Sequence, residues 1–237
     1  MILTRALTKR FGARQVLTGL DLTVEPGSVT LMIGANGAGK TTTMRLLAGL
    51  AEADSGDVVI AGHDLRTARR AALASLSFLP QAPRFHPRLT TEQVLAFHAQ
   101  LRGRERTEVP GALERWGLLD SARTPTGKLS GGLRQRLALA IFELADTPVR
   151  LLDEPGLSLD PEWRERLQSF LLAEARRGGT VLVATHLLGE WEDRASRCIL
   201  VEHGRCRGDI SPERLRDTFL GVERFPGLPR EPFAACG

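Results

Sequence analysis

A glycine-rich segment at residues 34–41 has the composition of a phosphate-binding loop. It consists of Gly-Ala-Asn-Gly-Ala-Gly-Lys-Thr, which fits the P-loop pattern of a glycine, four residues and Gly-Lys-Thr. In such a loop the backbone N–H groups converge on phosphate oxygens, the lysine reaches the terminal phosphates, and the threonine hydroxyl ligates Mg²⁺. An apolar strand, Val29–Ile33, precedes the loop as the pattern requires. The predicted nucleotide-binding residues are Gly34, Asn36, Gly37, Ala38, Gly39, Lys40, Thr41 and Thr42, with Thr42 donating to an inner phosphate.

Two consecutive acids follow a second apolar segment and could complete a hydrolytic site. Asp153 and Glu154 come directly after residues 149–152. Phosphoryl transfer needs an acid that holds the metal and a group that positions the attacking water. We expect Asp153 to hold Mg²⁺ through water and Glu154 to act as the general base or to orient the hydrolytic water, which favours an ATPase over a simple nucleotide-binding protein. Arg150 interrupts the apolar segment, and we expect its guanidinium to extend toward an edge of the sheet.

A third motif, Leu-Ser-Gly-Gly-Leu-Arg-Gln-Arg at residues 129–136, begins a helix. Ser130 can cap that helix, and its first turn presents N–H groups and a dipole to an anion. The segment resembles the signature sequence of ATP-binding cassette (ABC) proteins, and the resemblance extends over about residues 1–215. It implies that Ser130, Gly131 and Gly132 of one subunit close over the γ-phosphate held by the P-loop of another. Leu133 departs from the family, which usually has glutamine there.

The resemblance also implies roles for four further residues. Phe11 matches the aromatic residue that stacks on adenine, and the less favoured alternative is that this single aromatic belongs to the core. Gln81 matches the glutamine that contacts Mg²⁺ and the attacking water. Asp160 matches a loop that crosses the dimer, and it is equally explained as a helix N-cap. His186 matches the histidine that contacts the γ-phosphate and supports Glu154, although it could be an ordinary histidine at the end of a strand.

Alternating short apolar strands and amphipathic helices predict an α/β fold. Strand patterns without intervening helices near the N-terminus predict an antiparallel β subdomain, and the mainly helical pattern of residues 84–128 predicts an insertion. The resemblance implies a P-loop NTPase (RecA-like) core. We therefore expect one ABC ATPase domain over residues 1–220 and a tail at 221–237. The expected helix starts are Ser130, Thr90 with Gln93 as a capping box, and Asp160 followed by Pro161.

Composition excludes several other classes. The 237 residues are 42% hydrophobic and 25% charged, which is typical of a globular protein. The net charge of +4 is scattered, so we expect no nucleic-acid partner. The three cysteines form no CxxC pair, which argues against a zinc site. No apolar stretch approaches a membrane span, and the N-terminus lacks a signal-peptide pattern, so we expect a cytoplasmic protein.

The resemblance implies the ATPase subunit of a transporter, with ATP and Mg²⁺ as cofactors. Its partners would be a second ABC ATPase subunit, identical or different, and an integral membrane permease, which would place it on the inner face of the cell membrane. Residues 85–103 resemble cassettes of the drug-, haem- and copper-related export group. The alternative is a non-transport ABC ATPase of DNA repair or translation, but long heptad arms, zinc cysteine pairs and a second cassette are missing. A GTPase is disfavoured because its guanine-binding motif, Asn-Lys-x-Asp, needs an asparagine, and the only asparagine of the chain, Asn36, lies in the P-loop.

Overall fold

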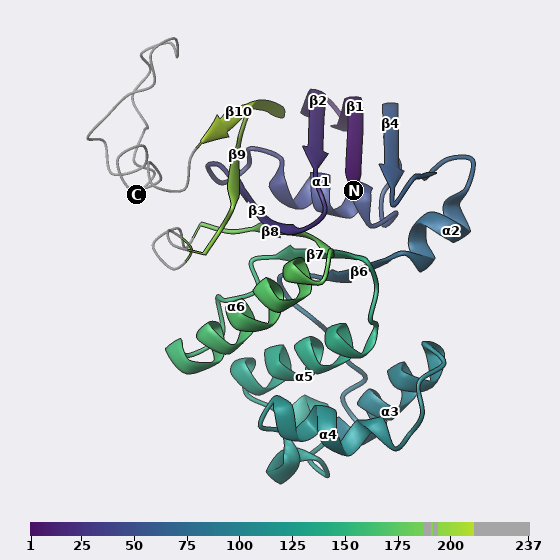
Figure 1. The fold of residues 1–237 in the computed structure, drawn as a ribbon, viewed down its shortest axis with the longest axis vertical. Coiled ribbons are helices and arrows are strands. Elements are labelled where there is room, and N and C mark those ends of the chain that lie inside the picture. Colours follow the sequence, from purple (N-terminus) through teal and green to yellow (C-terminus); the bar gives the residue numbers. More distant parts are fainter. Residues whose placement is uncertain (187–190, 192–193, 211–237) are drawn as a thin grey trace.

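The computed structural model describes residues 1–186, 191 and 194–210, and these residues form two β-sheets (Figure 1). The first sheet is antiparallel with the order β2-β1-β4-β5, and the second has the order β10-β9-β3-β8-β7-β6. In the second sheet β10 is antiparallel to β9, whereas β9, β3, β8, β7 and β6 pair in parallel. The strands are β1 (Ile2–Phe11), β2 (Arg14–Val24), β3 (Ser28–Ile33), β4 (Ser55–Ile60), β5 (His63–Asp64), β6 (Leu76–Leu79), β7 (Val149–Asp153), β8 (Thr180–Ala184), β9 (Arg197–Glu202) and β10 (Arg205–Ile210).

Helices cover both faces of the second sheet. In Figure 1, α1 lies between the two sheets, α5 and α6 lie on the opposite face of the second sheet, and α3 and α4 lie beyond α5. The helices are α1 (Lys40–Leu47), α2 (Arg69–Ala74), α3 (Thr91–Leu101), α4 (Glu108–Arg115), α5 (Gly131–Leu144) and α6 (Pro161–Arg176). Short 3₁₀ turns occupy Leu119–Ser121 and Thr126–Lys128. The predicted α/β core, N-terminal antiparallel sheet and inserted helices are all present. None of the described helices is long and apolar enough to cross a membrane.

The predicted helix starts are confirmed. Ser130 accepts the Leu133 N–H at the start of α5, and Asp160 accepts the Trp163 N–H at the start of α6. Thr90 forms the expected capping box at the start of α3. The sequence did not predict helix α2 or strands β5 and β10. The predicted domain boundary at residue 220 and the tail at 221–237 lie outside the described residues.

The prediction for Arg150 is wrong. Strand β7 lies between β6 and β8, so it is not an edge strand. Side chains alternate along a strand, and Arg150 points with Leu152 toward the core under α5 and α6. Its side chain is 1% exposed and forms an ion pair with Glu174 of α6. A buried charge needs a partner of this kind, and the sequence pattern of β7 alone does not reveal one on a later helix.

Candidate functional site

The register of the parallel strands brings the ends of four of them to one edge of the sheet. Asp153 of β7 and Met32 of β3 both pair with Ala184 of β8, and Leu79 of β6 pairs with Leu152 of β7. Ligand sites in open α/β sheets form at this carboxyl edge. The predicted site residues that follow these strand ends are Gly34, Gln81, Glu154 and His186.

The P-loop connects β3 to α1 and holds its lysine against its own backbone. Helix α1 begins at Lys40 directly after Gly39, which has a φ of 113°. The Lys40 ammonium donates to the carbonyl oxygens of Gly34 at 2.6 Å and Ala35 at 3.3 Å. Burial lowers the pKa of Lys40, and the nearby carboxylates of Glu154 and Asp153 act in the opposite direction. The loop therefore places a buried cation among backbone groups at the start of a helix, which is a setting suited to phosphate.

Close backbone contacts explain the first glycine of the loop. A Cβ on Gly34, whose φ is 153°, would lie 2.2 Å from the Val201 carbonyl oxygen of β9. The turn between β9 and β10 also touches the loop, because the Gly204 N–H donates to the Ala38 carbonyl at 3.1 Å. On the other side, a Cβ on Gly39 would lie 2.7 Å from a methyl group of Leu17 in β2. The loop is thus fixed between β2 and the β9–β10 turn.

Thr41 and Asp153 converge next to the P-loop. The Thr41 hydroxyl donates to Asp153 Oδ1 at 3.3 Å. Asp153 is 2% exposed, and this burial raises its pKa. A buried carboxylate beside a hydroxyl supplies the hard oxygen ligands that Mg²⁺ prefers, and a cation would offset the cost of burying the charge. The residues present therefore fit a magnesium ion that also contacts a phosphate.

Glu154 and His186 form a second pair at the same edge. The Glu154 N–H donates to the Ala184 carbonyl at 2.8 Å. Glu154 has a φ of 49°, which is unusual for a residue other than glycine. Its Oε2 accepts the His186 backbone N–H at 3.3 Å and lies 2.9 Å from His186 Nδ1. The His186 side chain is 50% exposed. One oxygen of a mostly buried carboxylate is therefore held at the entrance of the site.

Phe11 and Gln81 lie at the surface. Phe11 ends β1 and is 52% exposed, so the alternative that it is a core residue is wrong. The Lys9 ammonium lies 5.4 Å from the centre of its ring. Gln81 is exposed after β6, and the contacts among the described residues do not bring it to Asp153 or Glu154. Of the residues predicted at the magnesium site, the structure thus brings together Thr41 and Asp153.

The signature residues form a separate group at the starts of α5 and α6. Ser130 and Gly131 are exposed, and a Cβ on Gly132 would lie 3.0 Å from the Ser158 carbonyl oxygen. Asp160 follows in the same loop and caps α6. No contact in the described part of the chain joins this group to the P-loop. The exposed Ser130 and Gly131 leave the N-terminus of α5 accessible from solvent.

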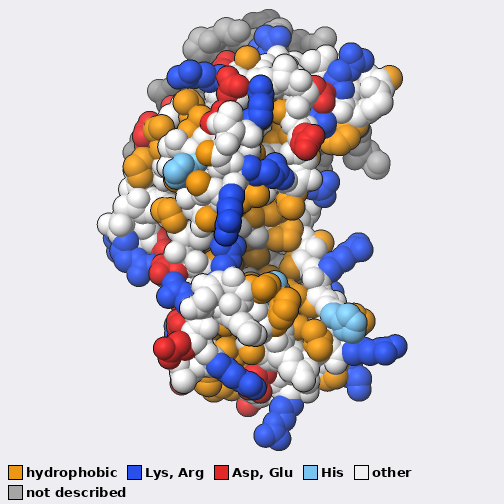
Figure 2. All heavy atoms as spheres, turned by 90° about the vertical axis from the view of Figure 1, so that its right-hand side faces the viewer, with side chains coloured by type: hydrophobic (Ala, Val, Ile, Leu, Met, Phe, Trp, Pro, Cys, Tyr) orange, Lys and Arg blue, Asp and Glu red, His pale blue; other side chains and the backbone are white. Residues whose placement is uncertain are grey.

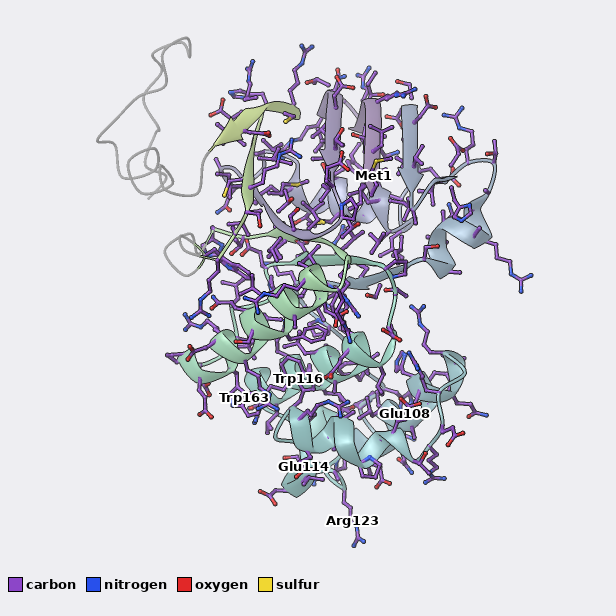
Figure 3. All side chains as sticks on the ribbon, in the orientation of Figure 1. Met1, Glu108, Glu114, Trp116, Arg123 and Trp163 are labelled. Atoms are coloured by element: carbon purple, nitrogen blue, oxygen red, sulfur yellow. The ribbon has the colours of Figure 1, made fainter. Side chains whose placement is uncertain are left out.

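Side-chain contacts attach this second group to the rest of the molecule. Trp163, in the first turn of α6, stacks on Trp116 at the end of α4 with ring centres 6.3 Å apart (Figure 3). Gln135 is 3% exposed, and its Nε2 donates to the Pro155 carbonyl at 3.0 Å. Gln135 thereby links the signature helix to the turn after Glu154, and sequence reasoning missed it. The signal was a single amide in a helix whose other buried residues are all apolar.

Known proteins are similar to this chain in sequence and in fold. The chain matches the family described as ABC transporter over residues 17–156. It is 33% identical to the Nod factor export ATP-binding protein I of Burkholderia orbicola, covering 92% of this chain and 73% of that protein. It is 35% identical to the daunorubicin resistance ATP-binding protein DrrA2 of Streptomyces coeruleorubidus, covering 93% and 69%. A solved ATP-binding subunit of an ABC transporter superposes with a TM-score of 0.83 at 26% identity, covering 92% of this chain and 93% of that one.

Proposed function

We propose that this chain, which belongs to the ABC transporter family, drives export through a separate membrane permease by hydrolysing ATP at the edge of its parallel sheet. The family establishes an ATP-binding subunit with ATPase activity, and the residues and partners are our proposal. The observation that carries it is the convergence of Thr41 on Asp153 beside Lys40 and of Glu154 on His186. Export is supported by the names of the two relatives, one an export and one a drug-resistance ATP-binding protein.

The chemistry follows from the positions of these side chains. Lys40 would leave its backbone carbonyls for the terminal phosphates, where its charge stabilises the transition state. His186 holds one Glu154 oxygen, and the other would orient the attacking water and accept its proton. Mg²⁺ would be held by Thr41, Asp153 and Gln81 and would neutralise charge on the phosphate oxygens.

Nucleotide binding would use Phe11 for the base and the P-loop for the phosphates. The exposed ring of Phe11 would stack on adenine, since an open aromatic face suits a planar base. The remaining contacts would come from backbone N–H groups of the P-loop and from the Thr42 hydroxyl. The predicted loop residues are Gly34, Asn36, Gly37, Ala38, Gly39, Lys40, Thr41 and Thr42.

A second ABC subunit, identical or different, would complete the site. The exposed start of α5 carries N–H groups and the positive end of a helix dipole, both of which favour an anion. Ser130, Gly131 and Gly132 of one subunit would cover the γ-phosphate bound by the other, and Asp160 would lie at the contact between them. ATP would then act as the ligand that shifts two subunits from an open to a closed arrangement.

The permease would contact the inserted helices and hold the chain at the inner face of the membrane. Helix α3 exposes two large apolar side chains, with Phe97 at 54% and Leu101 at 65%. Figure 2 shows hydrophobic side chains on this side of the molecule, in the hollow between its upper and lower parts. Exposed apolar groups of this kind favour contact with another protein.

The decisive experiment compares the wild type with Glu154→Gln. The variant keeps the shape of the side chain but cannot accept a proton, so we expect its phosphate release to fall by about a hundredfold or more. Its mass by size-exclusion chromatography with light scattering should double with Mg-ATP, because the closed dimer persists. Glu52→Gln, which changes an exposed glutamate elsewhere, is the matched control and should behave as the wild type. A Glu154→Gln protein that hydrolyses ATP normally would refute the proposed role.

A further inference from the structure

The turn that carries Phe11 also carries a cation, Arg14, at the start of β2. We propose that Arg14 is a further nucleotide-binding residue, whose guanidinium contacts the phosphate chain beside the P-loop. This inference rests on the proposed nucleotide site. It adds to that site a charged group that comes from the antiparallel sheet, outside the P-loop and the strand ends described above.

Strand pairing fixes the side from which Arg14 approaches. Phe11 and Arg14 are direct partners across the β1–β2 turn, and the next pair is Arg10 with Gln15. Directly opposed residues of an antiparallel pair lie on the same face, and successive pairs lie on opposite faces. Arg14 therefore shares the face of the exposed Phe11 ring, whereas Arg10 lies on the other face.

The guanidinium of Arg14 reaches the P-loop. A Cβ on Gly37 would lie 3.3 Å from Arg14 Nη2, so the guanidinium borders the middle of the loop. Arg14 is exposed, and within the part of the chain that the structure describes no hydrogen bond or ion pair holds its guanidinium. The nearby cation Lys9, by contrast, forms an ion pair with Asp54, with 2.9 Å between Lys9 Nζ and Asp54 Oδ1. The donors of Arg14 are thus available to a ligand.

The chemistry of the group matches the ligand expected there. A guanidinium presents a planar fork of donors that binds phosphate oxygens in a bidentate manner. Arg14 lies between the aromatic ring proposed to stack on the base and the loop proposed to hold the phosphates. A nucleotide that contacts both Phe11 and the P-loop must pass this guanidinium. The polyphosphate of the nucleotide would pair with the positive charge of Arg14.

The test compares three variants of the full chain by titration calorimetry and steady-state ATPase assays. Arg14→Gln should weaken binding of Mg-ATP by about tenfold, because a charge-assisted contact is lost. KM should rise with kcat within about twofold, as expected when a contact made equally in the ground and transition states is removed. Arg14→Lys should recover most of the affinity. Arg10→Gln removes the same charge from the other face of the hairpin and should bind within about twofold of the wild type.

The outcomes separate the two proposals. Wild-type affinity in Arg14→Gln, or an equal loss in Arg10→Gln, would overturn the contact while leaving the nucleotide site intact. A wild-type chain that binds no Mg-ATP would overturn the site and the contact together. Melting temperatures of the free variants provide the check on folding. A loss of affinity in Arg14→Gln at an unchanged melting temperature, with recovery in Arg14→Lys, is the result that supports the proposal.

Discussion

Replacing Glu174 by methionine should destabilise the protein severely, because it leaves the buried guanidinium of Arg150 without its main partner. Arg150 is 1% exposed, and burial lowers its pKa to about 10. Removing one partner of a buried ion pair costs about 3–5 kcal/mol. Asp146 Oδ1 at 3.9 Å and the Phe142 carbonyl at 3.4 Å remain near the guanidinium. We therefore expect a cost near the lower end, about 3 kcal/mol.

The double variant Arg150→Met/Glu174→Met should recover most of that loss. Both charges then disappear, and two unbranched apolar side chains fill the space beside Phe142 and Phe170, so the free energy of unfolding should return to within about 1 kcal/mol of the wild type. The matched control is Glu165→Met on the same helix, where the glutamate is exposed and pairs with Arg194, whose side chain is 34% exposed. Its ion pair, with Glu165 70% exposed, should be worth about 0–1 kcal/mol.

Urea denaturation followed by circular dichroism measures these differences. At an unchanged m-value the shift in midpoint converts directly into a free-energy change. A Glu174→Met variant that unfolds at the wild-type midpoint would refute the claim that Glu174 compensates the buried charge of Arg150. A double variant less stable than Glu174→Met would refute it equally, since it would show that the charges themselves stabilise the core.

Three further outcomes are expected. Gly204→Ala should lower the melting temperature markedly, because φ is 73° and a Cβ would lie 2.2 Å from the Val16 carbonyl oxygen; an unchanged thermal melt would contradict this contact. Burial raises the pKa of Asp153, so the folded state holds its proton more tightly and the free protein should lose stability as pH rises through that pKa. Asp153→Asn should remove this loss, and melting curves across the pH range without Mg²⁺ or nucleotide should show the variant more stable at pH 7. Thr90→Ala should cost about 1 kcal/mol in urea denaturation by removing the hydroxyl of the capping box, and Gln93→Ala should cost less.

Local patterns were enough to predict most elements and the core of the site. Apolar runs of strand length and capping residues report on structure within a few positions, so the helix starts at Thr90, Ser130 and Asp160 were correct. Thr41 and Asp153 were each assigned to Mg²⁺ from their motifs, and the structure brings them together because parallel strands deliver their carboxyl ends to one edge. Residue roles carried over from the family resemblance, such as that of Gln81, remain predictions.

Long-range partners were the part that sequence could not supply. Arg150 looked like a residue that must reach solvent because its partner, Glu174, lies on a helix far along the chain. Arg14 looked like one of many scattered arginines, and only the pairing with Phe11 and the approach to Gly37 single it out. Gln135 likewise shows its purpose only once the Pro155 carbonyl is seen beside it.

The two parts of the proposed site are held in place by different contacts. One part is the P-loop with the strand-end residues, and the other is the start of α5. Asp153 ends β7 and Lys40 follows the P-loop after β3, and the register of both strands with the intervening β8 brings these two residues to one edge of the sheet. Ser130 caps α5, whose position depends on side-chain contacts such as that of Gln135 with the Pro155 carbonyl. Groups held through side-chain contacts between helices shift when those contacts change, whereas residues at one sheet edge keep the spacing that strand register sets. Completing the proposed site with a second subunit therefore makes ATP binding sensitive to the arrangement of the helices.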